Sequence, residues 1–435
     1  MQLAYKYLIL FFFIFLTSCF LGPVKELKIQ IEDSWAEDSI SDLPELKPIK
    51  NSIQIYTKWK IDVGNNFHDN FNLFLDKDKL FLIDTLGNFY KLNSTNGEIL
   101  FNKNFKIKVL FGLTGDKEAI YFTTEDGFLW SLSHDGLIQW KVFVGQVLTK
   151  PFISKDSIVV RSLNYKFSSI NKKDGSLVWA YQSPLPPLTI NAWGEMTSYD
   201  NKLFSGLPGG KVLALDINLG TLLWEVTYSQ PKGSTEIDRA NDTTGSITND
   251  EYNIYAVSSK GNIASITIND GLLIWSRALS SFYGPHITQN SLFITHNSDA
   301  IYALNKDNNK VLWRNADFIG RGIHRGHLNS NYLIFGDSAG YLHFVNIIDG
   351  NSSGRLKIAD NKIIDNYVSN ENFNFLGLSN NGVIFSVNFK SSDYDIANKN
   401  NQSIQPSIDG NIDESNNQNI ENEDDSFLDS LKFWN

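Results

Sequence analysis

A unit of about 40 residues recurs along this chain, and it limits the possible folds more than any other feature. Each copy has a turn, usually Asp-Gly or Asn-Gly, followed by an apolar strand that ends in an aromatic residue. The aromatic residues are spaced 39, 39, 45, 51 and 38 residues apart, at Phe101, Trp140, Trp179, Trp224, Trp275 and Trp313. A further turn follows at Asp349-Gly350 without the tryptophan. Periods of this length indicate an array whose units bury their faces against one another.

Each closing strand is preceded by two apolar strands that share a turn of their own. Eight such pairs can be found, at Leu80–Leu92, Ile120–Leu132, Ile158–Ile170, Leu203–Leu215, Ile254–Ile266, Leu292–Leu304, Leu333–Val345 and Phe375–Val387. Asp-Gly and Asn-Gly allow the positive φ angles that tight hairpins require. Four strands in about 40 residues are typical of a β-propeller blade. The sequence therefore predicts an all-β, eight-bladed propeller with four antiparallel strands per blade, and no long helix between 51 and 390.

The ends of the repeat region predict how the ring closes. The eighth unit stops after Phe389 without a fourth strand, and an unassigned strand at Ile55–Ile61, containing Trp59, precedes the first complete unit. Pairing these two segments would remove a strand edge that is prone to aggregation. We therefore expect an N-terminal strand to complete the last blade, and the tryptophans to pack between neighbouring blades.

The N-terminus reads as an export signal with a lipidation site. Lys6 precedes an apolar run from Leu8 to Leu16 that is short for a membrane span and typical of a signal peptide. Leu16-Thr17-Ser18-Cys19 resembles a bacterial lipobox, whose cysteine becomes the lipidated first residue, and Cys19 is the single cysteine of the chain. The alternative is an ordinary secretory signal. A lone cysteine excludes internal disulfides and paired-cysteine redox chemistry.

Charge and composition divide the chain into four segments. Residues 1–18 are the expected signal peptide, 19–50 the lipidated cysteine with a flexible tether, and 51–390 the propeller. Residues 391–435 carry ten acidic residues and two lysines, which predicts an acidic disordered tail, with a short amphipathic end at Phe427, Leu428, Leu431 and Trp434. Residues 51–390 have no net charge, so we do not expect nucleic-acid binding, which needs a basic surface.

Besides a scaffold, the sequence leaves two other functions open: an enzyme and a ligand-binding propeller. A periplasmic quinoprotein, a PQQ-dependent dehydrogenase, would share the eight-bladed ring but needs a bound quinone and a Ca²⁺ site of clustered oxygens, for which the sequence offers no pattern. A propeller that binds a cell-wall or extracellular ligand is the other. His324 and His327 have the spacing of metal ligands, but Arg321 and Arg325 disfavour a cation there. We expect no cofactor and no catalytic residue.

Four features together resemble a known family. The eightfold repeat and the lipobox are joined by 233-GSTEIDR-239, in the longest insertion, and by the run from Gly336 to His343. The chain is similar to the PQQ-like repeat propellers and, more closely, to the BamB family of the outer-membrane β-barrel assembly machinery. The resemblance covers roughly 51–390. It implies a non-catalytic scaffold lipoprotein on the periplasmic face of the outer membrane of a Gram-negative bacterium.

The resemblance also implies partners and the residues that contact them. The partners would be a BamA-like barrel-assembly protein with its associated machinery, unfolded outer-membrane proteins, and the membrane through the lipid anchor. In that family the insertion helps to contact the barrel-forming partner, which implies binding roles here for Thr235, Glu236, Ile237, Asp238, Arg239 and Asp242. A Leu-x-Leu-Arg stretch of the family corresponds to Leu188 and Ile190, but Asn191 replaces its arginine. Because the insertion is charged, we expect the loss of its side chains to change stability by no more than about 0.5 kcal/mol.

Overall fold

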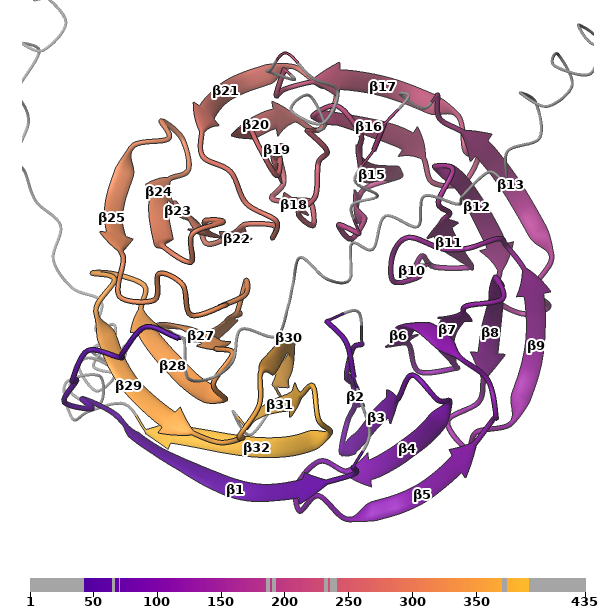
Figure 1. Ribbon diagram of the computed structural model, residues 1–435. Helices are drawn as coiled ribbons and strands as arrows, with labels where there is room; N and C mark the ends of the chain where they lie inside the picture. The colour runs from indigo at the N-terminus through magenta and orange to yellow at the C-terminus, as the bar shows by residue number, and fades with distance from the viewer. Residues whose placement is uncertain are drawn as a thin grey trace, which may run out of the picture. The chain divides into compact units, whose positions relative to one another are not determined.

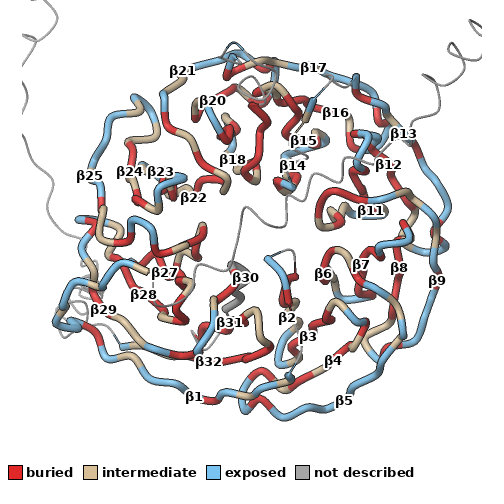
Figure 2. Tube along the Cα trace, viewed as in Figure 1, coloured by how far each residue is buried: buried red, intermediate tan, exposed pale blue. Residues whose placement is uncertain are grey.

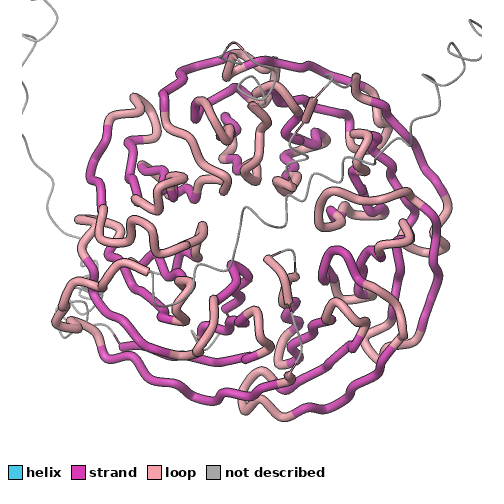
Figure 3. Tube along the Cα trace, viewed as in Figure 1, coloured by secondary structure: helices cyan, strands magenta, loops and turns pink. Residues whose placement is uncertain are grey.

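The described part of the chain consists of strands and their connections. The structure, a computed structural model, describes residues 43–390 except 65, 66, 70, 185–187, 190–192, 231–233, 235–240, 330 and 370–373. Within these limits every regular element is a β-strand, and the strands form eight sheets of four around a ring (Figures 1 and 3). The predicted all-β class and the eight blades are therefore confirmed. No helix among the described residues is long and apolar enough to cross a bilayer.

Blades 1 to 4 are formed by consecutive strands, numbered from the centre of the ring outward. Blade 1 consists of β2 (Phe74–Asp76), β3 (Lys79–Ile83), β4 (Asn88–Asn93) and β5 (Ile99–Asn104), and blade 2 of β6 (Val109–Gly115), β7 (Ile120–Thr124), β8 (Phe128–Leu132) and β9 (Ile138–Phe143). Blade 3 consists of β10 (Phe152–Ile153), β11 (Ser157–Arg161), β12 (Lys166–Asn171) and β13 (Leu177–Gln182), and blade 4 of β14 (Thr197–Tyr199), β15 (Lys202–Leu207), β16 (Lys211–Asp216) and β17 (Leu222–Thr227).

Blades 5 to 7 repeat this order, and blade 8 combines the two ends of the ring. Blade 5 consists of β18 (Thr248–Asn249), β19 (Asn253–Val257), β20 (Asn262–Thr267) and β21 (Leu273–Ala278), and blade 6 of β22 (His286–Ile287), β23 (Ser291–Thr295), β24 (Ile301–Asn305) and β25 (Val311–Asn315). Blade 7 consists of β26 (His327–Asn329), β27 (Tyr332–Gly336), β28 (Tyr341–Asn346) and β29 (Ser352–Lys357), and blade 8 of β30 (Ile363–Ser369), β31 (Phe375–Ser379), β32 (Val383–Lys390) and β1 (Gln54–Asp62).

The strand order places the connections on two opposite faces of the ring. Because neighbouring strands are antiparallel, the links between blades and the hairpins between second and third strands lie on one face, which we call the connector face. The remaining turns, including the repeated Asp-Gly turns, lie on the other. The middle strands are buried, whereas the outer strands expose much of their length (Figure 2). The β13–β14 and β17–β18 links, which contain the two segments implicated by the resemblance, therefore begin and end on the connector face.

In the blades that carry one of the repeated tryptophans, it joins that blade to the next, as predicted. In blade 3, the Trp179 indole N–H donates to the Ile217 carbonyl of blade 4 at 2.9 Å, and its ring lies against Gly220. Gly220 has φ +70°, and a Cβ added there would lie 2.5 Å from Trp179 Cδ2. The turn thus needs glycine both for its backbone angle and to admit the ring. Trp59, Trp140, Trp224 and Trp313 meet glycines of the following turn in the same way.

The ring closes through β1, as the unfinished last unit predicted. β1 pairs antiparallel with β32 from Gln54–Lys390 to Asp62–Val383, with one irregularity between Thr57 and Trp59. Trp59 is 9% exposed, and its indole N–H donates to the Ser94 carbonyl of blade 1 at 3.0 Å. The N-terminal strand therefore completes blade 8 and also joins blade 8 to blade 1.

Residues before β1 lie along the outer edge of blade 7. Arg321 Nη1 donates to the Pro44 carbonyl at 2.6 Å, and Arg355 Nη2 donates to the Lys47 carbonyl at 3.1 Å. The Asn51 side chain accepts a hydrogen bond from the Arg355 backbone N–H, and the Ser52 N–H donates to Ser353 O. Part of the segment expected to be a flexible tether therefore contacts the ring and covers the β29 edge. The rest of that segment, the signal peptide and the acidic tail lie outside the described residues.

Candidate protein-binding surface

The residues that the resemblance implicated are only partly described. Cys19, Thr235, Glu236, Ile237, Asp238, Arg239 and Ile190 lie outside the described residues. Leu188 lies on the link between β13 and β14, on the connector face, and is 37% exposed. Asp242 lies on the link between β17 and β18, on the same face. The two candidate segments therefore flank blade 4.

Asp242 differs from the expectation for a charged loop, because it is 1% exposed. Its neighbours from Asn241 to Gly245 are buried as well. The Thr243 N–H donates to Leu207 O at 3.1 Å, the Ser259 N–H donates to Asp242 O at 3.1 Å, and the Thr244 hydroxyl donates to Ser281 O at 2.9 Å. The C-terminal end of the insertion is thus built into blades 4 and 5. Stability should therefore depend on Asp242, contrary to the small effect expected from the sequence.

A buried arginine lies beneath both candidate segments. Arg161, at the connector-face end of β11, is fully buried. Its Nη1 donates to the Ser205 hydroxyl at 2.8 Å and to the Gly206 carbonyl at 2.6 Å, and its Nη2 donates to the Gly194 carbonyl at 3.3 Å. Burial lowers the pKa of the Arg161 guanidinium, while Tyr165 and Asp242 act in the opposite direction and favour the charge. Asp242 is therefore an electrostatic partner of Arg161.

Two glycines allow the end of the insertion to approach this arginine. A Cβ at Gly206 would lie 2.6 Å from Thr243 Cγ2, and a Cβ at Gly194 would clash with the carbonyls of Thr244 and Gly245. The Glu195 N–H donates to the Ser246 hydroxyl at 3.1 Å, so the β13–β14 link is also bonded directly to the end of the insertion. The two links and Arg161 form one packed unit.

Exposed apolar side chains lie next to the packed unit formed by the two links and Arg161. Trp193, next to Gly194, is 51% exposed, and Leu163 in the β11–β12 hairpin is also exposed. Tyr165 of that hairpin hydrogen-bonds Thr189, next to Leu188, and burial raises the Tyr165 pKa to about 12. Tryptophan is enriched among the residues that contribute most to protein interfaces. Trp193 was missed in the sequence because it lies outside the repeat, and its departure from the Trp spacing was the available signal.

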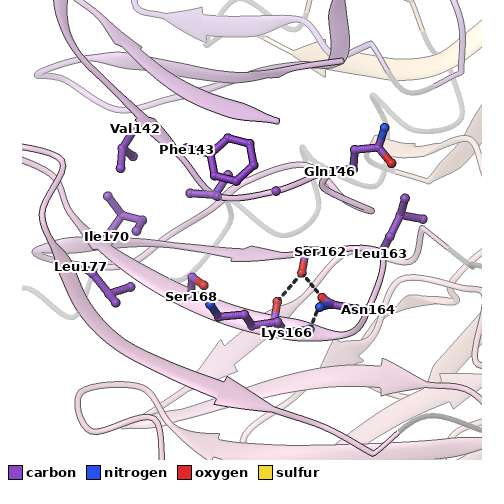
Figure 4. A pocket seen from close by; sticks show the side chains of 12 residues that line it. Val142, Phe143, Gln146, Ser162, Leu163, Asn164, Lys166, Ser168, Ile170 and Leu177 are labelled. Atoms are coloured by element: carbon purple, nitrogen blue, oxygen red, sulfur yellow. Dashed lines mark hydrogen bonds between the residues drawn. The ribbon is translucent and has the colours of Figure 1, made fainter. Parts of the chain in front are cut away.

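A groove of about 440 Å³ adjoins the surface at the boundary of blades 2 and 3 (Figure 4). Phe143, Leu163 and Leu177 give it an apolar lining, and Gln146, Asn164 and Lys166 supply polar groups. Asn164 is held by the Ser162 hydroxyl, which donates to Asn164 Oδ1 at 2.6 Å. Gln182 Nε2 donates to the Asn164 carbonyl at 2.7 Å, so the groove wall is bonded to the end of β13, where the β13–β14 link begins.

The conspicuous blade 7 residues form a buried charge cluster. Arg321 Nη2 donates to Asp337 Oδ2 at 2.5 Å, and His343 Nε2 lies 3.0 Å from the same oxygen. Burial acts to raise the Asp337 pKa, but the hydrogen bonds from His343 and Arg321 outweigh it and leave the pKa below its usual value. Burial lowers the pKa of His343. The cluster fixes the β27–β28 hairpin and, through Arg321, the segment at Pro44, so a structural role for His343 is favoured.

The two histidines with metal-ligand spacing lie in different surroundings. The buried His324 ring stacks on Tyr283, and its Nε2 lies 3.9 Å from Asp69 Oδ2. His327 begins β26 and contacts the ring of Phe375. Burial lowers the pKa of His324 to about 4. Across the described residues, no three His, Cys, Asp or Glu side chains gather where they could hold a metal ion.

Comparisons with known proteins agree with this architecture. A family model described as outer membrane protein assembly factor BamB matches residues 141–315. A relative from Shewanella oneidensis, also named outer membrane protein assembly factor BamB, is 28% identical over 334 residues, covering 72% of this chain and 84% of the relative.

Solved structures show the same ring. The crystal structure of BamB from Moraxella catarrhalis has a TM-score of 0.69 and 21% identity, covering 77% of this chain and 99% of that one. A quinohemoprotein alcohol dehydrogenase from Pseudomonas putida has a TM-score of 0.64 and 11% identity, covering 80% and 78%. The fold defines an eight-bladed propeller of the PQQ-like repeat class. Within that class, the family model and the relatives of that name confirm the resemblance to the BamB family.

Proposed function

We propose that this chain is a non-catalytic scaffold that assists the assembly of β-barrel proteins into the outer membrane. The observation that carries the proposal is the match to relatives named outer membrane protein assembly factor BamB, which spans 72% of this chain. The structure adds a rigid ring whose connector face holds two long links and an exposed tryptophan over a buried arginine. Binding residues on links supported by a rigid scaffold are a common arrangement.

The proposed partner is the outer-membrane barrel-assembly protein, and the proposed contacts are the links on either side of blade 4. They include Leu188 and Ile190 on the first link and Thr235, Glu236, Ile237, Asp238 and Arg239 in the insertion. Asp242 is buried, so its contribution would come through the conformation of the insertion. We expect a tagged full-length chain to recover the barrel-assembly protein from detergent-solubilised outer membranes. Recovery of no barrel-assembly protein, with the tagged chain folded, would contradict the proposal.

The proposed location is the periplasmic face of the outer membrane, with the chain anchored by a lipidated Cys19. One acyl chain gives only marginal membrane binding, whereas several chains anchor a protein stably, because each buried CH₂ adds about 0.8 kcal/mol. Cys19→Ser should therefore move the protein from the membrane pellet to the soluble fraction. A variant that still sediments with membranes after a high-salt wash would exclude lipid anchoring.

A dehydrogenase is the second candidate, because the Pseudomonas putida enzyme shares the ring at a TM-score of 0.64. At 11% identity that likeness concerns the fold alone, and the BamB relatives are 24–28% identical. We therefore favour the scaffold over the enzyme. Titration of the purified protein with pyrroloquinoline quinone and Ca²⁺, followed by quinone absorbance, separates the two. Stoichiometric binding with alcohol-dependent dye reduction would support the dehydrogenase.

A further inference from the structure

The contacts of Arg161 connect segments that are distant in the sequence and adjacent on the connector face. Its guanidinium donates to the Gly194 carbonyl in the β13–β14 link, and to Ser205 and Gly206 at the connector-face end of β15. Asp242, at the end of the insertion, is its electrostatic partner. One side chain of blade 3 thus holds the links that enter and leave blade 4.

The β13–β14 link contains no arginine or lysine of its own between 183 and 196. Arg161 delivers a guanidinium to the same link from the neighbouring blade, through the Gly194 carbonyl. Its planar fork can reach acceptors in separate segments at once, which an ammonium cannot do with the same geometry.

We propose that Arg161 is a positioning residue for partner binding, which holds Gly194 of the β13–β14 link and Asp242 at the end of the insertion in the arrangement that partner binding needs. The proposal rests on the proposed function for its partner. Arg161 itself is fully buried and touches no partner, so it acts through the exposed Trp193 and Leu188 and through the insertion. Pre-organised links bind more tightly because less conformational freedom is lost on association.

The buried location of Arg161 makes the choice of control important. Arg321 in blade 7 is also a buried arginine, and it is bound to Asp337 and to the Pro44 carbonyl. Arg321→Met therefore removes a buried cation at a place that contacts neither link. Arg161→Lys keeps the positive charge but loses the planar guanidinium with its several N–H donors. This variant keeps the proposal testable if Arg161→Met does not fold.

The test measures local order and binding separately in the full-length chain. Hydrogen exchange in peptides that cover 183–196 and 228–247 should accelerate at least tenfold in Arg161→Met, with a smaller change in Arg161→Lys and none in Arg321→Met. Affinity for the purified outer-membrane barrel-assembly protein should fall at least tenfold in Arg161→Met, which corresponds to about 1.4 kcal/mol. It should recover partly in Arg161→Lys and remain within twofold of wild type in Arg321→Met.

The exchange and affinity measurements distinguish a positioning role of Arg161 from general destabilisation and from a wrong proposed function. Unchanged exchange in both links, or accelerated exchange with unchanged affinity, overturns the positioning role. An equal loss of affinity in Arg321→Met also overturns it, because the effect would then reflect general destabilisation. If the wild-type chain fails to bind the barrel-assembly protein, the proposed function is wrong, while the exchange data still decide whether Arg161 orders the two links.

Discussion

The closure of the ring at Trp59 allows a quantitative prediction. Trp59 lies on β1, which completes blade 8, and it is 9% exposed. Its ring packs against Gly97 of blade 1, and its indole N–H bonds the Ser94 carbonyl. Trp59→Ala removes both contacts at the junction where the two ends of the propeller meet. Replacing a buried tryptophan by alanine typically costs about 3–5 kcal/mol.

The corresponding change in melting temperature follows from the size of the ring. Unfolding entropy is about 2.1 cal/mol/K per residue, so roughly 340 residues give about 0.7 kcal/mol/K. A loss of about 4 kcal/mol should then lower the melting temperature by about 6 °C. Trp59→Phe keeps most of the apolar contact but loses the N–H donor, so its cost should be about 1–2 kcal/mol.

The assay is calorimetry of the purified protein, with Tyr56→Ala as a matched control. Tyr56 lies on the same strand but is 40% exposed, so its removal should cost less than about 1 kcal/mol. If Trp59→Ala and Tyr56→Ala melt at the same temperature, β1 does not close the ring through Trp59, and the account of the closure is wrong.

Four further outcomes can be measured on the same protein. Gly220→Ala should destabilise by at least about 1 kcal/mol in denaturant titrations, because it strains a positive φ and meets the Trp179 ring. Asp242→Ala should cost more than about 1 kcal/mol, and equality with wild type would refute its buried role. Trp193→Ala should leave the melt unchanged and weaken partner binding about tenfold or more, as measured by calorimetric titration. The folded pKa of His324 is about 4, below its ordinary value near 6.5, so the unfolded chain binds the extra proton between these values and stability falls as the pH drops. Between pH 7 and pH 5 the stability advantage of wild type over His324→Gln should shrink by about 2 kcal/mol, and a constant difference would refute the low pKa.

The ring could be predicted from the sequence because its signals are local and repeated. A turn at Gly220 and a tryptophan at Trp179 each carry a recognisable pattern, and their contact follows once blades are placed in order. The closing strand was predictable for the same reason, since the last unit lacked one strand and β1 was left over. Because the units repeat, the strands and turns assigned in one unit could be checked against those of the other units.

The candidate surface could be predicted only in part, because its contacts are between distant segments. Nothing near Asp242 in the sequence shows that it is buried in the ring or that Arg161 is its electrostatic partner. The contact of Lys47 with Arg355 spans 308 residues, so the segment up to residue 50 was interpreted from the sequence as a tether. Burial of charges through several separate blades leaves no periodic pattern. The resemblance could therefore indicate a candidate surface, but the structure was needed to show which of its described residues are buried and what they contact.

The role in assembly can be measured directly with vesicles that contain the barrel-assembly machinery depleted of this chain. The assay follows the rate at which an unfolded outer-membrane β-barrel protein becomes protease-resistant in the vesicle membrane. A scaffold that binds the machinery through its connector face should increase this rate when the purified wild-type chain is added, and Trp193→Ala at the same concentration should increase it much less. An unchanged rate with the wild-type chain, shown to be folded and bound to the vesicles, would contradict the proposed role.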